Sequence, residues 1–177
     1  MSATQPNEAY LFMTELLTQS EKNGSIQQVF EMFRFGDFVD HAIDSLRDSE
    51  LFAVAGTFLL RTIEYNYQNI SSEQLPRIVD YLSMLNLPKR SSVIIFTDLI
   101  FAFLHTYGRR KNAIAPQFFK LAVDKYRSSL NEDESHNFLF NFLNIIDIFP
   151  SIPTVGIVEA ILFRYETSTC YIGELEL

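Results

Sequence analysis

Hydrophobic residues recur along this chain with the spacing of amphipathic helices. Within residues 8–22, for example, Tyr10, Leu11, Met13, Leu16 and Leu17 follow the i, i+3, i+4 pattern of one helix face. The same spacing predicts helices over about 8–22, 25–33, 37–47, 49–66, 71–85, 89–107, 116–130, 132–149 and 154–166. No segment alternates as a strand does, and 6 Gly and 6 Pro are few for an all-β chain. The pattern therefore predicts an all-α protein.

Glycine, proline and serine residues mark where these helices should begin and end. Gly24 should end the first helix, and Gly108 should end the helix over 89–107. Gly36 should break the chain between two short helices, and Ser49 should cap the helix that follows. Pro76 should lie in a first helical turn, where its missing N–H costs nothing.

The most hydrophobic stretch is Val93–Leu104, in which only Thr97 and Asp98 are polar. A helix that is apolar nearly all round is normally buried. The stretch is shorter than the roughly 20 apolar residues that span a bilayer. We therefore expect other helices to cover it on more than one side.

Longer and shorter helices alternate with a period of about 40 residues, the period of two-helix repeats. The first helices of the units begin near Glu8, Ser49, Lys89 and Glu132, and the second near Gly36, Ser71, Ala115 and Pro153. Aligning the units superposes Ile63 on Leu104 and Glu64 on His105. In the second helices a valine followed by an acid recurs as Val39-Asp40, Val79-Asp80, Val123-Asp124 and Val158-Glu159.

In period, helix alternation and helix length the chain resembles the armadillo/HEAT-like α-solenoid superfamily over about 8–167. The resemblance implies a right-handed superhelix of about four helix pairs, with a groove that binds proteins. The asparagine ladder of peptide-binding armadillo proteins and the HEAT proline, aspartate and arginine pattern are absent, so transport-receptor chemistry is not carried over. A compact irregular helical bundle is the alternative fold. Residues 1–7 are expected to be disordered, 8–167 to form one domain, and 168–177 to be a tail or a truncated repeat.

The net charge of −8 disfavours nucleic acid and anionic membrane as partners, because both bind basic surfaces. The N-terminus has no secretory signal pattern. A single cysteine, Cys170, excludes an internal disulfide and fits a reducing compartment. We therefore expect a cytoplasmic location, with the nucleus as the second choice.

The sequence shows no pattern of catalytic or metal-binding residues. His41, His105 and His136 lie on different predicted helices, and Cys170 has no basic neighbour in sequence. Phosphate-binding, dinucleotide-binding and nucleophile-elbow motifs are absent. We therefore expect no enzyme activity, no cofactor and no metal.

The recurring acids of the second helices are the candidate partner-binding residues. They are Asp40, Asp80, Asp124 and Glu159, with Arg77 and Lys120 close enough in sequence to neutralise part of the stripe. The one basic run contains Arg109 and Arg110 and could meet an acidic partner or simply complement a helix C-terminus. The acids could equally form an ordinary solvated face. The expected function is a protein-interaction scaffold or adaptor, whose partner carries a basic extended segment. The alternative is a compact regulatory domain that binds an amphipathic helix.

Overall fold

The computed structural model describes residues 4–31, 34–85, 90–110, 112–128 and 141. Within these residues all regular structure is helical, which confirms the all-α prediction. The predicted helices over 132–149 and 154–166 lie outside the described residues. So do Glu159, His136, Cys170 and the expected tail over 168–177.

The described residues form seven α-helices and one short 3-10 helix. These are α1 (Thr4–Lys22), α2 (Ile26–Phe30), α3 (Phe35–Ser45), α4 (Phe52–Asn66), η1 (Tyr67–Asn69), α5 (Gln74–Met84), α6 (Arg90–Arg109) and α7 (Ala115–Ser128). Helix α1 begins four residues before the predicted start at Glu8. It therefore includes residues 4–7, which the sequence pattern assigned to a disordered N-terminus.

The end of α1 follows the predicted glycine stop. Gly24 has a φ of +69°, which a glycine adopts without strain. The Ser25 amide donates to the Ser20 carbonyl at 2.8 Å, and the Gly24 amide donates to the Glu21 carbonyl at 3.1 Å. These two bonds form a Schellman motif, in which the last carbonyls of the helix gain partners.

Two glycines expected to interrupt helices lie inside them instead. Gly36 is in the first turn of α3, and the left-handed residue before that helix is Arg34, with a φ of +70°. Gly108 is buried within α6, which continues to Arg109. Neither glycine has a positive φ, so neither forms the left-handed stop that would end a helix.

The prediction for Pro76 is confirmed, whereas the prediction for Ser49 is wrong. Pro76 does lie in the first turn of α5. Ser49 does not cap α4, which begins three residues later at Phe52. The turn before α4 is held by Asp48, whose Oδ1 accepts from the amides of Glu50 at 2.8 Å and Leu51 at 3.4 Å.

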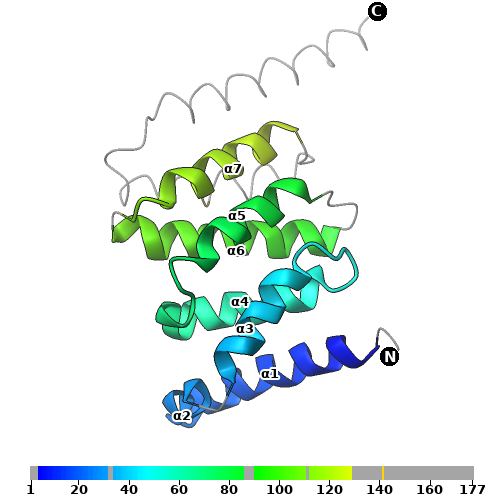
Figure 1. The fold of residues 1–177 in the computed structure, drawn as a ribbon, viewed down its shortest axis with the longest axis vertical. Helices are drawn as coiled ribbons and strands as arrows, with labels where there is room; N and C mark the ends of the chain where they lie inside the picture. Colours follow the sequence, from blue (N-terminus) through cyan, green and yellow to red (C-terminus); the bar gives the residue numbers. More distant parts are fainter. Residues whose placement is uncertain (1–3, 32–33, 86–89, 111, 129–140, 142–177) are drawn as a thin grey trace, which may run out of the picture.

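The helices are stacked in layers along the long axis of the molecule (Figure 1). In one row, α4 packs against α1 on one side and α6 on the other. In a second row, α5 lies between α3 and α7. The two rows are joined where α3 packs on α4 and α7 packs on α6. The alternation of longer and shorter helices in the sequence thus corresponds to two rows in space.

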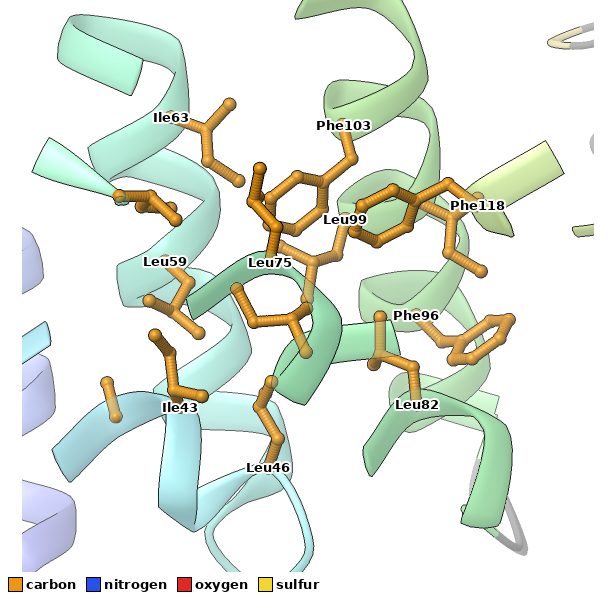
Figure 2. Packing of buried hydrophobic residues seen from close by; sticks show 14 of the residues in the cluster. Ile43, Leu46, Leu59, Ile63, Leu75, Leu82, Phe96, Leu99, Phe103 and Phe118 are labelled. Carbon is orange, nitrogen blue, oxygen red and sulfur yellow. The ribbon is translucent and has the colours of Figure 1, made fainter. Parts of the chain in front are cut away.

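The core lies between the two rows. Figure 2 shows Leu75 of α5 between Leu59 and Ile63 of α4 on one side, and Leu99 and Phe103 of α6 on the other. All five side chains are at most 3% exposed. Burial of each such side chain contributes roughly 1.5–3 kcal/mol, so the second row is held mainly by hydrophobic contact.

Helix α6 is covered as its composition predicted. Val93, Phe96, Leu99 and Ile100 are among its buried residues, while Ile94 remains 44% exposed. The buried Thr97 hydroxyl donates to the Val93 carbonyl at 2.8 Å, so this polar group costs little inside the core.

Candidate interaction surface

Arg77 is the centre of a polar cluster that joins the first two helices of the second row. From α5, its Nη1 is 3.0 Å from Asp40 Oδ1 and its Nη2 is 2.6 Å from Asp44 Oδ1, both on α3. The Tyr81 hydroxyl donates to Asp44 Oδ1 at 3.2 Å, and Gln74 Nε2 donates to Asp40 Oδ1 at 3.0 Å. One guanidinium group therefore links two carboxylates that lie one helical turn apart.

The ionisation of this cluster follows from these contacts. Burial raises the pKa of Asp44, but hydrogen bonds from Arg77 and Tyr81 and the nearby charges outweigh it, so the pKa is lowered overall. The hydrogen bond to Asp44 is the main cause of a raised pKa for Arg77. Both groups are therefore charged at neutral pH. The described bonds to Asp40 and Asp44 use Oδ1 in every case, so Oδ2 of each carboxylate takes part in none of them.

The other two described acids of the predicted stripe, Asp80 and Asp124, have exposed side chains. Asp80 is exposed on α5, and its carboxylate has no ion-pair partner among the described residues. On α7, Lys120 Nζ is 3.3 Å from Asp124 Oδ2, with the lysine side chain 81% exposed. Such exposed i,i+4 pairs contribute only about 0.3–0.5 kcal/mol. Of the three described acids, Asp40 is bound to the neighbouring helix, whereas Asp80 and Asp124 lie on open surface.

Arg110 and Arg109 have different surroundings at the end of α6. Arg110 Nη1 donates to the Thr106 carbonyl at 2.9 Å, and its guanidinium carbon lies 3.9 Å from the centre of the Tyr67 ring. It therefore holds the end of α6 to η1, with a cation–π contact in addition to the hydrogen bond. Arg109 is exposed. The structure does not bring either residue into the acidic surface of the second row.

A cleft between α4 and α6 was not predicted from the sequence. It measures about 560 Å³, and its apolar lining includes Leu60, Phe101 and Ala102. Its polar lining includes Arg61, Glu64, Asp98 and His105. The one available signal was the repeat alignment, which superposes Glu64 on His105. That alignment gives equivalent positions on the two helices, but not the distance between them.

Of the charged side chains that line this cleft, Arg61 and Glu64 form an ion pair, whereas Asp98 does not. Arg61 Nη1 is 2.5 Å from Glu64 Oε2, so these two charges largely cancel. Asp98 has no hydrogen-bond or ion-pair partner in the described part of the chain. Burial and the Glu64 charge raise its pKa, against a smaller opposing effect of Arg61. Burial and the Arg109 charge lower the pKa of His105, so this imidazole is neutral at pH 7.

The described residues contain no group of three or more side chains that could hold a metal ion. His41 and His105 lie on α3 and α6 and do not form a common site. No described helix has the length and hydrophobicity needed to cross a bilayer.

Comparison with known proteins found no match among protein-family models, curated proteins or solved structures.

Proposed function

We propose that this protein is a non-catalytic interaction scaffold of the armadillo/HEAT-like α-solenoid type. In this proposal each first-row helix and the second-row helix that follows it form one repeat, and the partner lies along the groove lined by α3, α5 and α7. The observation that carries the proposal is the continuity of the second row. Side-chain bonds join its successive helices, from Tyr81 to Asp44 and from Lys125 Nζ to the Leu85 carbonyl at 2.7 Å.

The chemistry of this surface favours a partner with a basic extended segment. Asp80 offers an exposed carboxylate in the middle of the row, and Asp124 lies at the equivalent position on α7. The bonds from Arg77, Gln74 and Tyr81 use Oδ1 of Asp40 and Asp44. The Oδ2 atom of each carboxylate can therefore accept a hydrogen bond from a partner. Charge-assisted hydrogen bonds of this kind are the stronger ones in proteins. Arg77 then serves to hold α3 and α5 in register and does not contact the partner.

Charge reversal at the two exposed acids, Asp80 and Asp124, tests the proposal. The probe is a fluorescent, unstructured peptide with lysines and arginines at every second position, and the readout is fluorescence anisotropy. We expect the double variant Asp80→Lys with Asp124→Lys to bind it about five- to tenfold more weakly, since two exposed contacts are reversed. The matched control is Glu21→Lys with Glu50→Lys, which changes net charge equally at exposed acids outside the row. Equal weakening in both variants would reduce the effect to net charge and overturn the proposal.

A second candidate, a compact regulatory domain that binds an amphipathic helix, is favoured by one feature of α1. Leu11 and Phe12 are adjacent and remain 59% and 65% exposed. Glu8 and Glu15 are exposed one turn away on either side, so the face is apolar with acidic ends. In the same assay, a helix-forming basic peptide that binds more tightly than the extended one, and no longer binds after Leu11→Ser with Phe12→Ser, would favour this candidate.

A further inference from the structure

We propose that the cleft between α4 and α6 binds the cationic side chain of a partner, an arginine or lysine whose aliphatic stem lies on the apolar wall. The site is independent of the surface proposed above, because no residue of α3, α5 or α7 lines it. It is formed by two neighbouring helices of the first row. A partner could therefore occupy it with or without contacting the second row.

The sign of the charge in the cleft determines the ligand class. The 2.5 Å pair between Arg61 and Glu64 is close to neutral, and His105 is neutral at pH 7, so Asp98 supplies the net charge of −1. An anion would meet Asp98 and Glu64 and would find Arg61 already paired. Glu64, Asp98 and His105 all line the cleft, but no three such side chains among the described residues are placed to hold one metal ion. A single monovalent cation is the charge that this lining accommodates.

The shape and polarity of the cleft narrow the ligand further. Leu60 comes from α4, and Phe101 and Ala102 from α6, so both walls have an apolar part. Lysine and arginine bury their methylene stems along such surfaces while the charged head reaches a polar group. Asp98 is solvent-accessible, yet the surrounding protein removes enough water to raise its pKa. A cation beside it would replace the lost hydration, which is the physical reason for binding.

Titration of the ¹⁵N-labelled protein with N-acetyl-arginine amide, followed by NMR, tests the site. We expect saturable shifts of the amides of Leu60, Phe101 and Ala102. Asp98→Asn should weaken binding about tenfold, the effect expected for loss of one charge-assisted hydrogen bond. The matched control Asp80→Asn removes an exposed carboxylate from the second row and should leave the titration unchanged.

Two further compounds test whether the charge of the ligand matters. N-acetyl-norleucine amide has an apolar side chain without the charge, and equal binding of this compound would reduce the site to an apolar groove. N-acetyl-glutamate amide binding more tightly than the arginine compound would assign the cleft to anions through Arg61. Either result overturns the proposal.

We expect Asp98→Asn to fold normally, so a loss of binding in this variant would not come from unfolding. Because the fold raises the pKa of Asp98, it already disfavours the charged form, and the neutral amide should fold at least as well. As a second variant, Ala102→Phe retains Asp98 but fills the cleft, and it should also weaken binding. Failure of the scaffold proposal would leave this result unaffected, since Asp80 and Asp124 lie on other helices.

Discussion

At the scale of single residues, the polar side chains that matter most join one layer to the next. Tyr107 of α6 donates to the Tyr67 carbonyl at 3.3 Å, Lys125 of α7 donates to the Leu85 carbonyl, and Arg77 of α5 binds two acids of α3. Each partner lies 33 to 40 residues earlier in the chain. These bonds fix how far each layer is shifted on the one before it, which hydrophobic contact alone does not specify.

Tyr107 gives a prediction for alkaline pH. Its side chain is 4% exposed, and burial, with a smaller effect of Tyr67, raises its pKa to about 12. The pKa in the unfolded chain is 10.0, so the native state holds this proton more tightly. The free energy of unfolding should therefore not depend on this group below pH 10. It should fall as pH rises from 10 to 12, by up to about 2–3 kcal/mol. Urea unfolding at several pH values measures this slope.

The control is Tyr107→Phe, compared with the wild type at every pH. At pH 8 the variant should lose about 1 kcal/mol with its hydrogen bond. Its stability should then fall less steeply than that of the wild type above pH 10. Lys125, whose pKa burial lowers, acts with the opposite sign but is present in both proteins, so its contribution cancels in the difference. Parallel curves for the two proteins above pH 10 would contradict the assignment.

At the scale of helices, the sequence predicted which segments are helical better than where they end. Apolar spacing and the Gly24 stop are local features, and both appear in the structure as expected. The helix start predicted near Gly36 agrees with α3, but neither Gly36 nor Gly108 adopts the positive φ of a glycine stop, and Ser49 does not cap α4. Gly108 is instead buried within the last turns of α6, where Tyr107 contacts Tyr67 and Arg110 contacts the Thr106 carbonyl. Gly108 therefore stays helical, and α6 ends at Arg109 instead of at the predicted glycine stop.

The approach of α4 to α6 yields a second prediction, at Gly56. A Cβ atom built on Gly56 would lie 2.7 Å from Ile95 Cγ2. Alanine would gain about 1 kcal/mol of helix propensity, but overpacking a core typically costs 1–3 kcal/mol. Ile95 is β-branched and has little rotamer freedom in a helix. We therefore expect Gly56→Ala to destabilise the protein by about 1 kcal/mol, measured by urea unfolding.

Gly36 and Ile95 provide the controls. A Cβ on Gly36 meets no atom within 4 Å, so Gly36→Ala should stabilise the protein by about 0.4–1 kcal/mol. Ile95→Ala removes the opposing methyl group, and in that background Gly56→Ala should no longer destabilise. An unchanged cost in the double variant would show that the close approach to Ile95 is not the cause.

At the scale of the whole molecule, the candidate surface was the hardest feature to predict. From the sequence, Asp40, Asp80 and Asp124 were predicted to lie at equivalent helix positions, with Arg77 close to them along the chain. The sequence could not show that Arg77 bridges from α5 to α3, because that contact depends on the distance between two helices more than 30 residues apart in the chain. The cleft at Asp98 was missed for the same reason. Patterns within a helix predict its buried face, whereas a site between helices depends on their spacing.

The shape of the full chain separates the two architectures, and small-angle X-ray scattering measures it. A compact 177-residue bundle should have a radius of gyration of about 16 Å. We expect a larger value and a distance distribution with an extended tail. In the solenoid proposal each layer contacts only its neighbours, so added layers lengthen the stack. The same protein in guanidinium, with a radius of about 45 Å, controls for unfolded material. A folded, monomeric sample at about 16 Å with a symmetric distribution would favour the compact bundle. It would also remove the continuous groove that the scaffold proposal requires.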